Sequence, residues 1–157
     1  ITDEEGHHAL ETLRTLPHVH LLGRKSVEEV PCYIAACDVC LLPYRVNEWT
    51  RNIDSLKLYE YLACGKPVVA TDVPAARRFS EVVKIVTGEA QFITNMNEAL
   101  DEDSPVLRAK RQRVAAQHTW EQRVAALSAA IEDRLRERHS LQAGEPVLTE
   151  GEGRDSG

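Results

Sequence analysis

Residues 56–71 read LKLYEYLACGKPVVAT, and this stretch decides the fold. Its first part, Leu56 to Cys64, has apolar residues at helical spacing, and Gly65 is a typical residue for ending a helix. Its second part, Pro67 to Thr71, is a short apolar run of the kind that forms a strand buried on both faces. A helix that leads directly into such a strand predicts parallel strands joined by helices.

The same alternation continues on both sides of this stretch. The predicted strands are the short apolar runs 19–22, 39–42, 67–71 and 82–86. Ser26 and Glu29 form a capping-box pattern that starts another helix. We therefore predict an α/β fold with a Rossmann-like parallel sheet, helices on both faces and a helical C-terminal end. The predicted helices are 4–16, 26–36, 56–64, 74–79, 90–100, 105–118 and 120–138.

Composition limits the classes of function. The chain has 157 residues, which fits one domain, and no apolar run approaches the ~20 residues that a bilayer crossing needs. A formal charge of −6 and an aromatic content of 5% argue against a dedicated nucleic-acid binder. The chain starts at Ile1 without a signal segment, so a fragment or a processed chain is expected. Residues 1–139 are predicted to form the domain, and residues 140–157 a disordered tail.

The cysteines allow two interpretations. Cys37 and Cys40 have C-x-x-C spacing, which is compatible with a zinc or redox site completed by His18 or His20. Against a zinc site, Cys64 stands alone in the sequence, and free cysteine commonly behaves as a small buried apolar residue. We therefore expect free thiols, no bound metal and a reducing cytoplasm.

A candidate site lies in the most polar internal stretch, residues 43–55, which follows a predicted strand. In parallel sheets, ligands bind beyond the carboxyl ends of the strands. The helix that starts near Ser55 directs free N–H groups and its positive dipole end into this loop, which suits a phosphate. Arg51 and Lys57 flank this helix start, and Glu60, one turn further on, can accept hydrogen bonds from the two hydroxyls of a ribose. The alternative is that Ser55 only caps the helix and Glu60 is solvated.

Four motifs carry a resemblance to a known family. Residues 58–71 resemble the nucleotide-sugar signature of retaining glycosyltransferases with the GT-B fold. Residues 17–23 (PHVHLLG), 38–43 (DVCLLP) and 119–123 (TWEQR) resemble further motifs of these enzymes, in the same order. The resemblance implies the later part of the donor-binding lobe of a two-lobed enzyme, without its first strand or two and without the acceptor lobe.

The resemblance also implies a set of donor-binding residues. By analogy, Glu60 holds the ribose hydroxyls of a nucleotide-diphosphate sugar, and the backbone at Ser55 and Leu56 holds its diphosphate. Many relatives carry a second glutamate at the position of Asn52, so the sugar contact departs from the family pattern. No catalytic residue is assigned, because the acceptor lobe is expected upstream. The other donor-binding residues implied are Asn47, Thr50, Arg51, Asn52 and Lys57.

The implied reaction is transfer of a glycosyl group from a donor such as a UDP- or GDP-sugar to a hydroxyl of a saccharide or lipid-linked acceptor. Retention of configuration and independence of metals and cofactors are implied as well. The implied setting is cell-envelope polysaccharide biosynthesis in the cytoplasm, with a peripheral contact at the inner membrane face as an option. This lobe alone is expected to be inactive, since the site is shared between two lobes.

Two other functions stay open at this point. One is a non-catalytic Rossmann-like or flavodoxin-like interaction module. The other is a basic helical surface for an anionic membrane or a nucleic acid, because residues 105–139 carry eight basic and four acidic groups. A solvated face with ion pairs is the simpler interpretation of those charges. Trp120 is expected to anchor the last helix by packing rather than to stack on a ligand.

Overall fold

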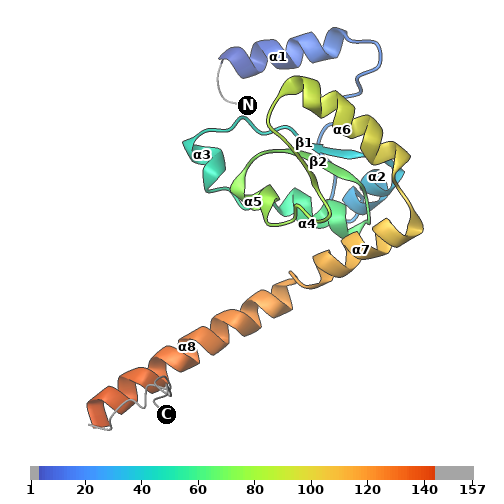
Figure 1. Cartoon of the computed structure of the whole chain (residues 1–157). Helices are drawn as coiled ribbons and strands as arrows, with labels where there is room; N and C mark the ends of the chain where they lie inside the picture. Colours follow the sequence, from blue (N-terminus) through green and yellow to red (C-terminus); the bar gives the residue numbers. More distant parts are fainter. Residues whose placement is uncertain (1–3, 144–157) are drawn as a thin grey trace, which may run out of the picture.

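Three short parallel strands form the centre of the computed structural model, which describes residues 4–143 (Figure 1). The strands are β1 (Cys40–Leu42), β2 (Val68–Thr71) and β3 (Lys84–Val86), in the spatial order β1-β2-β3. Both strand pairs are parallel. Cys40 lies opposite Val68 in the first pair, and Val69 lies opposite Lys84 in the second. This sheet confirms the predicted α/β class.

Helices cover both faces of the sheet because successive residues of β2 point to opposite sides. Val68 and Ala70 pack against α2 (Val30–Ala36), α4 (Leu56–Ala63) and α7 (Pro105–Ala116), whereas Val69 packs against α6 (Glu89–Asp101), which lies on the opposite face (Figure 1). All these β2 side chains are almost completely buried, as expected for a parallel sheet with two covered faces. The helices are α1 (Glu4–Thr15), α2 (Val30–Ala36), α3 (Glu48–Arg51), α4 (Leu56–Ala63), α5 (Pro74–Arg77), α6 (Glu89–Asp101), α7 (Pro105–Ala116) and α8 (Trp120–Ala143).

The turn between α4 and β2 has the predicted glycine ending. Gly65 has a φ of +72°, and its N–H donates to the Leu62 carbonyl at 2.9 Å. The Lys66 N–H donates to the Tyr61 carbonyl at 3.0 Å, which completes a Schellman motif. The motif satisfies the last carbonyls of α4 and directs the chain into the central strand.

Substituting Gly65 by alanine is expected to lower the free energy of unfolding by about 2 kcal/mol. A Cβ at this position would lie 2.4 Å from Cγ of Arg108, and the left-handed backbone itself costs an L-residue about 1–2 kcal/mol. Gly23→Ala is the matched control, because Gly23 has a φ of +70° but open space around it. Urea unfolding of both variants separates the two costs. Equal losses would show that the contact with Arg108 costs nothing.

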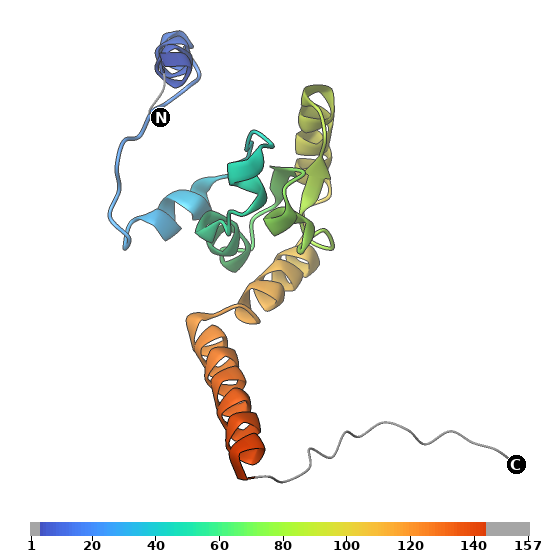
Figure 2. The same cartoon turned by 90° about the vertical axis from the view of Figure 1, so that its left-hand side faces the viewer.

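The predicted strand at residues 19–22 is wrong. In the structure this segment pairs with no described strand, and Leu21 and Leu22 are exposed. It belongs to an extended connection that runs from α1, which stands apart from the sheet, to α2 (Figure 2). A short segment of this kind forms a strand only where a partner strand accepts its hydrogen bonds, and no described strand lies on the outer side of β1.

Other boundaries differ less. The capping box is confirmed, since Glu29 N–H donates to Ser26 Oγ at 3.3 Å and Ser26 N–H to Glu29 Oε2 at 3.0 Å. The helix itself starts at Val30, after a turn. Residues 140–143, predicted as tail, belong to α8, and residues 144–157 lie outside the described residues.

Helix α8 extends away from the sheet (Figure 2). A row of apolar side chains along it is exposed: Val124, Leu127, Ile131, Leu135 and Leu141. Arg134 and Arg136 form ion pairs with acidic residues of the same helix. No helix within residues 4–143 combines the length and the apolar character needed to cross a membrane.

Candidate functional site

The carboxyl edge of the sheet is hollowed, as the fold class predicts. A cavity of about 780 Å³ lies beyond the ends of the three strands. Tyr44 and Arg45, after β1, line it together with groups that follow β2 and β3, among them Asp72 and Gly88. Arg77 of α5 donates two hydrogen bonds to Asp72, so this ion pair closes one side of the cavity.

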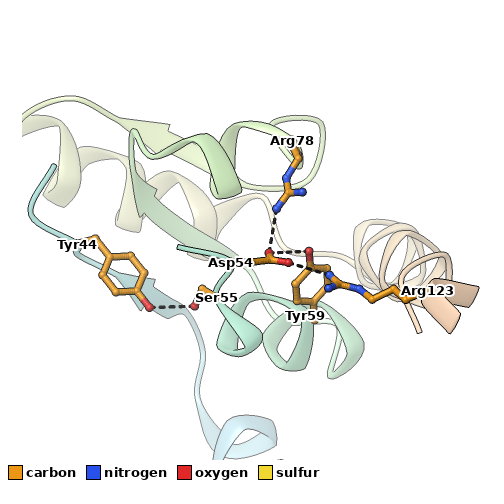
Figure 3. A network of polar contacts seen from close by, with 6 residues as sticks. All are labelled: Tyr44, Asp54, Ser55, Tyr59, Arg78 and Arg123. Carbon is orange, nitrogen blue, oxygen red and sulfur yellow. Dashed lines mark hydrogen bonds and ion pairs between the residues drawn. The ribbon is translucent and has the colours of Figure 1, made fainter. Parts of the chain in front are cut away.

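The N-terminus of α4 lies next to this edge and has no side-chain cap. Ser55, the residue before the helix, is only 6% exposed, and its hydroxyl lies 2.9 Å from the Tyr44 hydroxyl (Figure 3). The side-chain cap of the alternative interpretation is therefore absent, whereas Ser55 stands at the N-cap position and Glu60 is exposed, as that interpretation expects. The N–H groups of Leu56 and Lys57 are left without a side-chain acceptor from Ser55, which suits an anion at the helix start.

Asp54, directly before Ser55, is the centre of a polar network (Figure 3). Its carboxylate accepts hydrogen bonds from Tyr59 Oη at 2.9 Å, from Arg78 Nη2 at 2.9 Å and from Arg123 Nη2 at 3.1 Å. Partial burial alone would raise the pKa of Asp54, but these hydrogen bonds and the arginine charges lower it below its ordinary value. The carboxylate is therefore held in its charged form.

Tyr59 fixes this network to the core. Its ring meets Phe79 edge-on, with 5.4 Å between ring centroids, and the guanidinium of Arg123 lies 4.8 Å from its centroid. Partial burial and the hydrogen bond to Asp54 raise the pKa of the Tyr59 hydroxyl, so it stays a donor. The first turns of α4 and α8 thus share one set of contacts.

Glu60 is exposed on α4 and lines a second cavity, of about 350 Å³, between α4 and the junction of α7 and α8. Leu56, Trp120 and Arg123 also line this cavity. Trp120 is 66% exposed, so the expectation that it anchors α8 by packing is wrong. Glu60 and Leu56, the first residue of α4, thus line the same cavity.

The other predicted donor-binding residues lie elsewhere. Asn47 accepts a hydrogen bond from the Thr50 N–H and so starts α3, a short helix inside the predicted loop. Thr50 is buried, and its hydroxyl donates to the Arg45 carbonyl at 2.6 Å. Arg51, Asn52 and Lys57 are exposed, and none of these five residues lines the cavity of Glu60.

The residues of the Asp54 network were not singled out as site residues from the sequence. Arg123 lies in the recognised TWEQR motif, and Asp54 lies two residues before the predicted helix, but Arg78 gives no sequence signal. Their meeting depends on tertiary structure, because Arg78 and Arg123 are 24 and 69 residues away from Asp54 along the chain.

The described part of the chain holds no group of His, Cys, Asp and Glu side chains that could bind a metal ion. The four cysteines are free. Burial of Cys40 in the core raises its pKa to about 12, so its thiol stays protonated and unreactive at neutral pH.

A comparison with protein families decides the classification. The model described as "Glycosyl transferases group 1" matches residues 2–102, from the start of α1 beyond the end of α6. The chain belongs to this family. The resemblance seen in the motifs of the sequence is thereby confirmed at the level of the family.

Two curated relatives of this glycosyltransferase family are similar over parts of the chain. TuaH of Bacillus subtilis (strain 168), named as a glycosyltransferase of teichuronic acid biosynthesis, is 29% identical over 117 residues, which cover 71% of this chain and 30% of TuaH. The uncharacterized glycosyltransferase MJ1178 of Methanocaldococcus jannaschii is 38% identical over 58 residues, which cover 37% of this chain and 15% of that protein. No solved structure matches the chain. The chain thus spans less than a third of the length of either relative.

Proposed function

We propose that this chain forms part of the donor-binding lobe of a glycosyltransferase that uses a nucleotide-diphosphate sugar. The observation that carries the proposal is the pairing of an uncapped helix start with an exposed carboxylate on the same helix. In this arrangement the amides at Leu56 and Lys57 face the diphosphate, and Glu60 accepts hydrogen bonds from the ribose hydroxyls. Membership of the family supports glycosyl transfer as the reaction of the whole protein.

The proposed chemistry follows from this placement. As the bond between the sugar and the diphosphate breaks, negative charge grows on the leaving phosphate oxygen. The amide dipoles at the start of α4 stabilise that charge in the transition state, and they need no rearrangement to do so. The proposal includes independence of metal ions and of cofactors, with retention of configuration at the transferred sugar.

The acceptor is proposed as a hydroxyl of a saccharide or of a lipid-linked saccharide. The name of TuaH supports cell-envelope polysaccharide biosynthesis as the setting. A basic membrane surface on α8 is less favoured, because Arg134 and Arg136 are paired with acids of the same helix.

The test is binding of UDP, GDP and ADP to the whole protein that contains this chain, measured by calorimetry. At least one diphosphate is expected to bind, and Glu60→Ala is expected to weaken it about 10- to 100-fold, since a hydrogen bond to a charged group contributes about 1.5–3 kcal/mol. The matching 2′-deoxynucleotide should bind wild type less tightly, and Glu60→Ala should remove that preference.

Glu132→Ala is the control, because Glu132 is an exposed acid on α8 that does not line the cavity of Glu60. It should bind the diphosphate like wild type. A Glu60→Ala variant that keeps full affinity and still distinguishes ribose from deoxyribose would contradict the proposed site.

A further inference from the structure

We propose that Asp54 is a positioning residue, which holds the first turn of α4 in place through its hydrogen bonds to Tyr59, Arg78 and Arg123. This inference rests on the proposed function, because the turn that Asp54 holds is the one assigned to the donor diphosphate. Asp54 itself does not line the cavity of Glu60, so any influence on donor binding passes through the helix.

The first step of the argument is that α4 cannot fix its own start. A helix of eight residues is too short to be stable by itself, and its N-terminus has no side-chain cap. Its direction is therefore set by tertiary contacts. Near its start these are the Ser55–Tyr44 hydrogen bond and the contacts of Asp54.

The second step is that Asp54 joins three separate parts of the fold. Tyr59 belongs to α4, Arg78 follows α5, and Arg123 lies in the first turn of α8 (Figure 3). Since one carboxylate accepts from all three, a movement of α4 relative to α5 or α8 breaks at least one hydrogen bond. Contacts with α5 and α8 thus constrain a residue that lies two positions before the first residue of α4.

The third step concerns charge. One carboxylate lies between two guanidinium groups, and asparagine has nearly the same shape but no charge. The asparagine amide would also direct its N–H groups toward Tyr59, Arg78 and Arg123, which are themselves hydrogen-bond donors. Asp54→Asn therefore removes the attraction that holds Arg78 and Arg123 and leaves their mutual repulsion. We expect this to change the position of the start of α4 without removing any group that contacts the nucleotide-sugar donor.

The experiment measures UDP affinity of the whole protein by calorimetry, with GDP and ADP titrated in parallel. Asp54→Asn is expected to weaken UDP binding about tenfold, because a displaced binding group loses most of its contribution. Glu98→Gln is the matched control, because it also turns an ion-paired carboxylate into an amide. Glu98 pairs with Lys84 on the other face of the sheet, away from α4. The UDP affinity of this control should equal that of wild type.

A second variant guards against loss of folding. Arg78→Gln removes only one of the three hydrogen-bond donors, at a residue that does not line the cavity of Glu60. It should weaken UDP binding about threefold, and Asp54→Asn/Arg78→Gln should lose no more than Asp54→Asn alone. All affinities are measured well below each thermal midpoint, where a purely stabilising residue would leave the UDP affinity unchanged.

The outcomes separate the two proposals. If Asp54→Asn and Arg78→Gln bind UDP like wild type while Glu60→Ala does not, the inference is overturned and the proposed function stands. If wild type binds none of the three nucleotides, both are overturned. Weaker binding by the Asp54 and Arg78 variants, with Glu98→Gln unchanged, supports the positioning role.

Discussion

Replacing Asp103 by asparagine is expected to lower the free energy of unfolding by about 3 kcal/mol, the cost typical of breaking a buried ion pair from one side. Its partner Arg111 lies in α7 with a side chain that is only 7% exposed. The guanidinium donates to Asp103 Oδ1 at 2.6 Å and to the Gly65 carbonyl at 3.1 Å. Without the carboxylate, the buried positive charge keeps only neutral acceptors, the Gly65 carbonyl and the asparagine amide oxygen.

The pH dependence of this loss has a definite sign. Burial alone would raise the pKa of Asp103, but hydrogen bonds and charges from Arg111 and Arg108 lower it below its ordinary value. A carboxyl with a lowered pKa in the folded state contributes fully above its unfolded-state pKa of about 3.9, and the contribution is lost as the pH falls through the folded-state pKa. The difference between wild type and Asp103→Asn should therefore shrink below about pH 4.

Urea unfolding followed by circular dichroism, at neutral pH and at a series of acidic pH values, measures both effects. Glu102→Gln is a suitable control, because Glu102 is an exposed acid next in sequence whose partner Lys84 keeps a second acid, Glu98. It should change stability little. An Asp103→Asn variant as stable as wild type at neutral pH would show that Arg111 does not need the charge.

Replacing Phe79 by alanine is expected to lower the free energy of unfolding by about 3–4 kcal/mol. Phe79 is 2% exposed and meets two other rings edge-on, with centroids of Tyr59 at 5.4 Å and His118 at 5.0 Å. The loss includes the transfer energy of the ring and the cavity that remains under α4. Thermal unfolding measures it, and Ile93→Ala, at an exposed position of α6, should change the midpoint little.

The same variant tests how the core supports the site. Because Phe79 holds the ring of Tyr59, its removal should also loosen the hydrogen bond from Tyr59 to Asp54. Phe79→Leu keeps most of the apolar volume and should recover more than half of the lost stability. Equal losses for alanine and leucine would mean that ring contacts, rather than volume, hold this part of the core.

Much of the fold could be predicted because its signals are local. The apolar run before Thr71 is nearly completely buried, as such runs are in parallel sheets, and the glycine at 65 has the left-handed backbone that its place after a helix indicates. The predicted strand at 19–22 fails because pairing depends on a neighbour that the local sequence does not encode. The short helix α3 was missed, although Asn47 and Thr50 have the spacing of a cap.

The candidate site, too, could be predicted from the sequence only where its signals are local. The start of α4 and Glu60 could be placed from helical spacing alone, and the structure brings Leu56 and Glu60 to one cavity. The side chains that hold this helix in place could not be predicted, because Arg78 and Arg123 meet Asp54 only after the chain has folded. Exposure of Trp120 was also beyond the sequence, since an aromatic residue at a helix start has the same spacing whether it packs or not.

The position of β1 at the border of the sheet has a practical consequence. No strand within residues 4–143 covers its outer side, and Leu41 is partly exposed there. Unpaired backbone along such a border is a template on which another extended polypeptide can align. We therefore expect aggregation of this chain, on heating or at high concentration, to start at the outer edge of β1. Leu41→Lys is the simplest protection.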